Sequence, residues 1–128
     1  MFITQTLRRA VQINARGTAT IFGERRQTWQ QFQERVARLA GALKELDVGR
    51  ADRVAILALN SDRYLKYVYG VAWAGAACNP VNIRLAPPEI AYTSAKASSS
   101  GTVSGSADAG LPTSALVHAA HTRAALDA

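Results

Sequence analysis

The amino-acid composition of this chain changes abruptly near residue 92, and this change limits what the chain can fold into. Residues 1–92 contain all nine aromatic residues and 13 of the 15 basic residues. Residues 93–128 contain no aromatic residue, and 24 of these 36 positions are Ala, Ser, Gly or Thr. Because such a segment has little large apolar surface to offset the entropy lost on ordering, we expect a folded unit over residues 1–92 and a disordered or weakly helical tail over residues 93–128.

The first thirty residues have the pattern of a short helix followed by a β-hairpin. Apolar residues share one stripe of a helix over residues 4–14, which ends before Gly17. The runs TATIF (18–22) and RRQTW (25–29) flank Gly23 and Glu24. Two β-prone runs separated by two such residues favour a hairpin with a two-residue turn.

The clearest helix is predicted to begin after Thr28. Thr28 and Gln31 have the spacing of a capping box, in which each side chain bonds to the other residue's backbone. Apolar residues then recur every three or four positions, so the helix should run to about Leu46 and stop before Gly49. The predicted buried stripe consists of Trp29, Phe32, Val36, Leu39, Leu43 and Leu46.

A strand, a helix and a second strand follow, which is the pattern of a βαβ unit. Residues 52–59 carry an unbroken apolar run after Arg53, typical of a parallel strand that is covered on both faces. Residues 60–76 predict a helix capped by Asn60 or Ser61, and residues 77–83 predict a short second strand. We therefore expect an α/β fold.

Two long stretches in this order resemble the N-terminal start of the adenylate-forming acyl-CoA synthetases, above all the fatty-acid CoA ligases. They are QTWQQFQERVARLAGALKELDVGRADRVAILALNS (27–61) and YLKYVYGVAWAGAACNPVNIRLAPPEIAYT (64–93), whose core P-V-N-x-R-L-x-P-x-E-I-A-Y is the most distinctive part. The resemblance implies that residues 1–92 are the first subdomain of the synthetase N-terminal domain, with a β-hairpin, a long helix and a βαβ unit. A βαβ pattern alone does not require a particular residue at each of several further positions, and the residues found there together support the resemblance. They are Gly49, Asp52, Gly75, Pro80, Asn82, Arg84 and Glu89.

The resemblance also implies a reaction: a fatty acid is activated with ATP to an acyl-adenylate, and the acyl group is then transferred to coenzyme A, with magnesium accompanying the ATP. The family's phosphate loop, its adenine and ribose contacts, its hinge and its catalytic lysine all lie downstream of the matching region. No residue of 1–92 matches them, so we expect no catalytic, cofactor-binding or metal-binding residue here. We expect this chain to retain no ATP, magnesium or coenzyme A and to be inactive alone.

The stretch SSSGTVSGS (98–106) is the one place where a phosphate loop could lie in this chain. Small residues let backbone N–H groups converge on phosphate oxygens, but such a loop also needs a preceding apolar strand and a lysine. Neither is present, and Asp108 follows closely. A flexible linker is therefore favoured over a phosphate loop.

Five other residues invite a functional interpretation, and a structural one is favoured for each. His118 and His121 could share a helical face and bind a metal, but two histidines without a third ligand make a weak site. Cys78 falls in a predicted strand and is expected to be a small core residue rather than a nucleophile. Trp29 and Trp73 are expected to anchor helix packing.

The net charge of +6 raises the question of nucleic acid as a partner. The arginines are scattered over every predicted element with acids between them, and no known nucleic-acid module accompanies them, so a solvated surface is favoured.

No apolar run is long enough to cross a bilayer and residues 1–17 do not read as a signal peptide, so a cytoplasmic location is expected. The single cysteine allows no internal disulfide.

The end of the resemblance near residue 93 has two explanations. One is a shift of reading frame in GC-rich DNA, which agrees with 12 arginines against 3 lysines. Translation of the other two frames tests it: if neither gives an apolar strand and a phosphate loop ending in lysine, a genuine short protein is favoured. Independently of this test, a second role is open, in which the chain is a binding module that docks on a full-length synthetase or on itself through an uncovered sheet edge and uncovered apolar helix faces.

Overall fold

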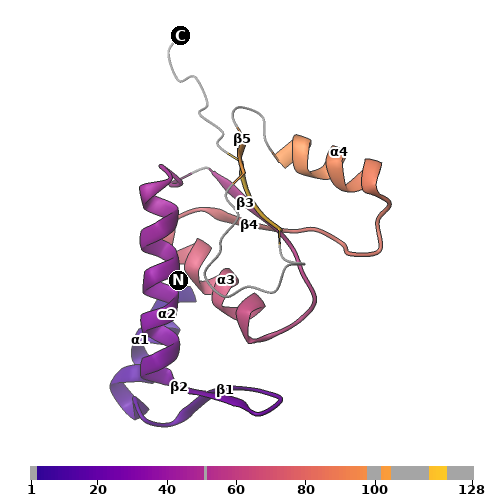
Figure 1. Cartoon of the computed structure of the whole chain (residues 1–128). Coiled ribbons are helices and arrows are strands. Elements are labelled where there is room, and N and C mark those ends of the chain that lie inside the picture. Colours follow the sequence, from indigo (N-terminus) through magenta and orange to yellow (C-terminus); the bar gives the residue numbers. More distant parts are fainter. Residues whose placement is uncertain (1–2, 51, 98–101, 105–115, 121–128) are drawn as a thin grey trace.

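The computed structural model describes residues 3–50, 52–97, 102–104 and 116–120. In chain order the elements are α1 (Ile3–Asn14), β1 (Thr18–Phe22), β2 (Arg25–Thr28), α2 (Trp29–Glu45), β3 (Arg53–Leu57), α3 (Asp62–Ala74), β4 (Ala77–Pro80), α4 (Pro87–Ala97), β5 (Thr102–Ser104) and β6 (Leu116–Ala120). The helices and strands pack as one α/β unit, in which α1 and α2 lie side by side and α3 packs against α2 and β4 (Figure 1).

The hairpin and the capping box that precede the long helix are confirmed. β1 and β2 pair antiparallel, and Gly23 in the turn has a φ of 58°. The Gln31 N–H donates to Thr28 Oγ1 at 3.2 Å, and the Thr28 N–H donates to Gln31 Oε1 at 3.0 Å. The helix stops before Gly49 as expected, although the residue with the left-handed backbone is Asp47, with a φ of 58°.

The predicted βαβ unit is also confirmed. β3 and β4 pair in parallel, with Arg53 opposite Ala77 and Ile56 opposite Pro80. Of the two candidate caps for the intervening helix, Ser61 is the N-cap, because its side chain accepts a hydrogen bond from the Tyr64 N–H. The helix ends at Gly75, whose φ of 90° is a backbone conformation that a side chain would strain.

The sheet contains two strands that the composition of the tail does not predict. β6 pairs antiparallel with β3, and β5 pairs antiparallel with β6, so the strand order is β4-β3-β6-β5 and the sheet is mixed. Backbone ladders need no large side chains, which is why a segment of small residues can contribute them. The other residues of the expected tail after Ala97 lie outside the described residues.

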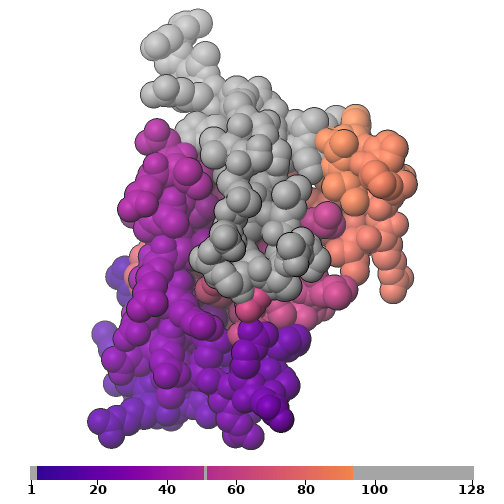
Figure 2. All heavy atoms as spheres, viewed as in Figure 1, coloured from indigo at the N-terminus to yellow at the C-terminus, as the bar shows by residue number. Residues whose placement is uncertain are grey.

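Helix α4 is placed apart from the packed helices. It contacts β3 and β6, and Figure 2 shows its surface (orange) on the opposite side of this view from α2 (purple). The helix begins at Pro87 and continues to Ala97, past the compositional break. No helix in the described part of the chain combines the length and the apolar character needed to cross a membrane.

The core lies where α2 and α3 meet the sheet. One cluster of buried residues includes Leu43, Val54, Ile56 and Val71, and a second contains Leu7, Phe32 and Val36 where α1 meets α2. α2 and α3 approach closely at Gly70, where a Cβ would lie 2.6 Å from Leu39 Cδ2. Glycine is needed here because the leucine side chain fills the space that a Cβ would take.

Tyr67 joins α3 to both parallel strands through its hydroxyl. The hydroxyl donates to the Val54 carbonyl of β3 and accepts from the Asn79 N–H of β4, at 3.0 Å for the latter bond. Burial raises the pKa of Tyr67, so the neutral hydroxyl is retained.

We expect Tyr67→Phe to lower the free energy of unfolding by about 2 kcal/mol, because two buried backbone groups lose their partner. Chemical denaturation followed by circular dichroism measures the change. Tyr69→Phe is the matched control, since no hydrogen bond joins its hydroxyl to the described residues, and it should change stability by less than about 0.5 kcal/mol. Equal losses in the two variants would contradict the bridging role of Tyr67.

Candidate functional site

The first candidate site is a hollow at the carboxyl ends of the two parallel strands. Ligands of open α/β sheets bind outside the carboxyl ends of the strands. The hollow has a volume of about 330 Å³. Its lining, which defines the carboxyl-end hollow, is Ala58, Leu59, Asn60, Tyr64, Pro80, Val81, Asn82 and Ile83.

The distinctive motif of the sequence forms one wall of this hollow. Asn82 Oδ1 accepts from the Arg84 N–H at 2.9 Å, which fixes the turn that leaves β4. Glu89 Oε2 accepts from the Ala86 N–H at 2.8 Å, as a carboxylate does at the start of a helix. Both motif residues therefore shape the backbone between β4 and α4.

The chemistry of the hollow is limited by its lining. Five of its eight residues are Ala, Leu, Pro, Val or Ile, and the polar groups are two asparagine amides and one tyrosine hydroxyl. Leu59 is 71% exposed and Ile83 is 47% exposed. No charged residue is among the eight, so the lining offers an apolar surface and amide hydrogen bonds rather than an acid, a base or a phosphate cradle.

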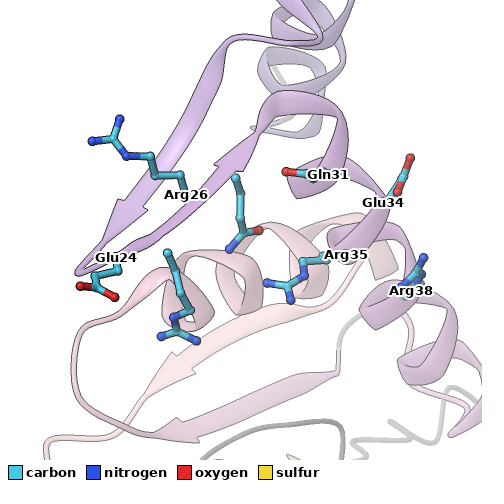
Figure 3. A pocket seen from close by; sticks show the side chains of 8 residues that line it. Glu24, Arg26, Gln31, Glu34, Arg35 and Arg38 are labelled. Carbon is cyan, nitrogen blue, oxygen red and sulfur yellow. The ribbon is translucent and has the colours of Figure 1, made fainter.

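The second candidate site is a pocket of about 450 Å³ between the hairpin and α2. Glu24, Arg25, Arg26 and Gln27 come from the hairpin, and four residues spaced along one face of α2 complete it (Figure 3). The lining that defines this arginine pocket is Glu24, Arg25, Arg26, Gln27, Gln31, Glu34, Arg35 and Arg38. Arginines thus outnumber carboxylates by four to two.

Asp62, in the first turn of α3, binds two hairpin residues that line the arginine pocket, Arg25 and Gln27. Its side chain is 2% exposed, and it pairs with the guanidinium of Arg25 at 3.0 Å. Gln27 Nε2 donates to the other carboxylate oxygen at 2.8 Å, while Gln27 Oε1 is buried and has no hydrogen-bond partner among the described residues. Asp62 therefore fixes the hairpin against α3 and neutralises only one of the four arginines.

A further positive group, the amine of Lys66 on α3, lies close to Arg35 of α2. Burial lowers the pKa of Lys66, and the nearby charges of Arg35 and Arg63 lower it further, against Asp62, which raises it. The arginines that look scattered in the sequence are thus brought together by the packing of β2, α2 and α3. The spacing of residues within a single helix or strand does not predict that arginines from different elements line one pocket.

The candidates in the tail fall largely outside the described residues. Of the stretch 98–106, the structure describes only residues 102–104, which form β5 and pair with β6 instead of forming a linker there. His118 lies in β6 opposite Ala55, so the disfavoured alternative in which it shares a helical face with His121 does not hold, and His121 lies outside the described residues. No group of three metal-ligating side chains occurs among the residues that the structure describes.

The packing positions expected for the cysteine and the two tryptophans are confirmed. Cys78 is half-buried in β4 and packs against the main core cluster, and its Sγ donates to the Val68 carbonyl at 3.7 Å. Trp29 and Trp73 pack against the cluster around Phe32. The guanidinium of Arg8 also lies 5.0 Å from the centre of the Trp73 ring, a stabilising cation–π contact.

We expect alkylation of Cys78 by iodoacetamide to reach half its maximal rate at a higher pH than alkylation of free cysteine. Burial raises the pKa of the Cys78 thiol, and the thiolate is the reacting form. The rate is measured by mass spectrometry over a pH series, with the urea-unfolded chain as the control. A half-maximum below that of the unfolded chain would identify an activated thiol and contradict the structural role.

Comparison with known proteins assigns the fold to a family. The sequence model of one family, described as AMP-binding enzyme, matches residues 7–127. The chain belongs to the AMP-binding enzyme family. The match to this family continues past residue 92, and the position of a boundary there stays a prediction.

Relatives that this AMP-binding family chain resembles include acyl-CoA ligases. The long-chain-fatty-acid–CoA ligase of Thermus thermophilus is 43% identical over 67 residues, 52% of this chain and 12% of that protein. The peroxisomal acetate/butyrate–CoA ligase AAE7 of Arabidopsis thaliana is 38% identical over 86 residues, 67% of this chain and 15% of that protein. The N-terminal domain of FACL13 from Mycobacterium tuberculosis is similar in structure, with a TM-score of 0.68, 33% identity and coverage of 73% of this chain and 24% of that chain.

These matches define how much of the family fold is present. The α/β architecture is that of the acyl-CoA synthetase N-terminal domain, as the resemblance implies. The chain spans about 15% of the length of the curated ligases that it matches.

Proposed function

We propose that this chain is the first subdomain of an AMP-forming fatty-acid CoA ligase. The observation that carries the proposal is the hydrogen-bonded turn from β4 to α4, in a chain that belongs to the AMP-binding enzyme family. The reaction of the whole enzyme would activate a fatty acid with ATP and transfer the acyl group to coenzyme A. The names of relatives such as the Thermus thermophilus enzyme support fatty acids as the substrate class.

We further propose that the chain is inactive without the rest of such an enzyme. ATP phosphates need cations and converging N–H groups, and magnesium needs carboxylates. The lining of the carboxyl-end hollow contains neither a cationic side chain nor a carboxylate. The lining therefore does not fit ATP, magnesium or the diphosphate of coenzyme A, and no step of the reaction is derived from it. Catalysis in this class depends on positioning phosphates, so the chain alone lacks a means of lowering the barrier.

An assay of pyrophosphate release tests this proposal. The purified chain is incubated with ATP, magnesium and a fatty acid, and pyrophosphate is measured with and without coenzyme A. A full-length ligase assayed in parallel is the positive control. We expect release equal to that of the buffer blank, and release that depends on the fatty acid would overturn the proposed inactivity.

A second candidate function is docking on a full-length synthetase or on another copy of the chain. The observation in its favour is the exposure of Leu59 and Ile83 on the rim of the carboxyl-end hollow, since exposed apolar patches mark contact surfaces. Size-exclusion chromatography with light scattering, with and without an added synthetase, measures it. Association that Leu59→Ser abolishes would support docking, and a monomer unaffected by the synthetase would contradict it.

A further inference from the structure

Two buried polar atoms of the hairpin have no partner among the described residues. Thr20 is 9% exposed and Gln27 is 8% exposed. Thr20 Oγ1 and Gln27 Oε1 are shielded from bulk solvent, and neither atom makes a hydrogen bond with the part of the chain that the structure describes. A buried hydroxyl or amide oxygen without a hydrogen bond costs free energy, so the two atoms indicate a bound partner.

The two atoms belong to one place in the fold. Thr20 of β1 lies directly opposite Gln27 of β2 in the antiparallel register. Side chains at opposite positions share one face of a hairpin, with their Cβ atoms about 5 Å apart. A ligand small enough to lie between them therefore contacts both.

The orientation of the Gln27 amide is fixed by Asp62. Gln27 Nε2 donates at 2.8 Å to the Asp62 carboxylate, which only accepts hydrogen bonds. Turning the amide over would bring two acceptors together, so Oε1 has to point away from Asp62. The partner of Gln27 Oε1 must therefore be a donor, and the rotatable hydroxyl of Thr20 can donate to that same partner.

The surrounding charges favour a neutral ligand. Asp62 already has the guanidinium of Arg25 at 3.0 Å as its counter-ion. Three more arginines, Arg26, Arg35 and Arg38, line the adjoining arginine pocket and would repel a cation. An anion has no hydrogen to donate to an amide oxygen, whereas a water molecule both donates and accepts and spans about 4.5 Å between two oxygens.

We propose that one water molecule is bound inside the hairpin, where it accepts from the Thr20 hydroxyl and donates to Gln27 Oε1. Its second hydrogen is available to the Asp62 carboxylate, which accepts one bond from Arg25 and one from Gln27 and has about four lone pairs. The water thus joins β1 to the contact that Asp62 makes between β2 and α3. This site does not depend on the proposed ligase reaction.

The sign of the stability change in Thr20→Val tests the proposal. Valine keeps the shape of the side chain but removes the hydroxyl, so the water loses a partner and the midpoint of thermal unfolding should fall by about 6 °C. If the hydroxyl has no partner in the folded chain, its removal relieves a buried polar group and the midpoint rises. A rise or no change would overturn the proposal.

Thr18→Val is the matched control, because Thr18 lies on the same strand and is exposed. Its hydroxyl contacts bulk water, so the midpoint should change by less than about 2 °C. An equal fall in Thr18→Val and Thr20→Val would show that the strand itself tolerates valine poorly, and it would also overturn the proposal.

Oxygen-17 relaxation dispersion counts the water molecules that stay bound for longer than the chain takes to tumble. We expect one such water fewer in Thr20→Val than in the unsubstituted chain, and an unchanged number in Thr18→Val and in Thr20→Ser, which keeps the hydroxyl. Circular dichroism establishes that the variants remain folded. The same number in Thr20→Val and the unsubstituted chain would indicate a direct bond between Thr20 and Gln27 and would overturn the proposal, as would loss of the water in Thr20→Ser.

Exchange of the salt separates a bound water from a bound cation. The midpoint of the unsubstituted chain should be the same in sodium, potassium and choline chloride at equal ionic strength, because a neutral ligand does not respond to the cation. A midpoint that rises in sodium or potassium alone, and does so only while Thr20 is present, would assign the site to that cation instead.

Discussion

Asp62→Ala is expected to lower the free energy of unfolding by about 3 kcal/mol, because it removes the buried partner of both an arginine and a glutamine. The carboxylate accepts from Arg25 at 3.0 Å and from Gln27 at 2.8 Å. Gln27 is 8% exposed, so water does not replace the lost bond readily. The guanidinium side chain is 47% exposed, which keeps the expected loss at the lower end of the range for broken buried pairs.

Urea denaturation followed by tryptophan fluorescence measures this loss. Asp62→Asn keeps the shape of the side chain and one acceptor oxygen, so about half of the loss should be recovered. Glu45→Ala is the control, since it removes an exposed acid near the end of α2 and should change stability by less than about 0.5 kcal/mol. A loss of the same size in the control would show that net charge, rather than the buried pair, governs stability.

Phe32→Ala is expected to lower the free energy of unfolding by about 4 kcal/mol, because it opens a cavity where α1, α2 and α3 meet. Phe32 is 1% exposed and belongs to the cluster with Leu7 and Val36. Its ring also packs edge to face against Tyr69, with 5.6 Å between the ring centres and an interplanar angle of 81°. A loss of this size approaches the whole stability of a small domain.

Two companion variants make this prediction measurable even if the alanine variant is largely unfolded. Phe32→Leu retains most of the volume and should cost about 1 kcal/mol. Phe22→Ala removes the same ring from β1, where it is 44% exposed and lies under the Arg25 guanidinium, and should cost about 1 kcal/mol or less. Equal losses for Phe32→Ala and Phe22→Ala would contradict the buried position of Phe32.

The sequence predicts local structure well where one residue pattern has one physical solution. The capping box at Thr28 and Gln31 forms as predicted, because both partners lie within one turn of the chain. The run from Val54 to Ile56 is fully buried as an apolar parallel strand should be.

The same pattern rules fail where the helix faces are ambiguous. In α2, Ala40 is buried, whereas Leu46, the C-cap residue expected in the buried stripe, is 43% exposed, the reverse of what the size of the two side chains suggests. α3 is apolar almost all round, so periodicity does not reveal that Tyr67 and Gly70 face inward. Tyr67 is buried because its hydroxyl finds two backbone partners, and Gly70 because it gives room to Leu39.

For the candidate sites, the sequence identifies the loop from Pro80 to Glu89 through its motif, since the turn and cap bonds join residues two or three apart. The arginine pocket has no such signal. Its members come from a strand and a helix whose side chains meet only when the hairpin packs against α2 and α3, with Asp62 fixing the hairpin to α3.

The sequence by itself thus determined the order of the elements from residue 3 to residue 80, their caps and the family to which they belong. These features depend on interactions between near neighbours, which spacing along the chain records. Only the tertiary structure decided that β6 pairs with β3, that Tyr67 bridges two strands, and that four arginines line one pocket. Each of these depends on the approach of segments distant in sequence, and this approach is set by the packing of whole elements.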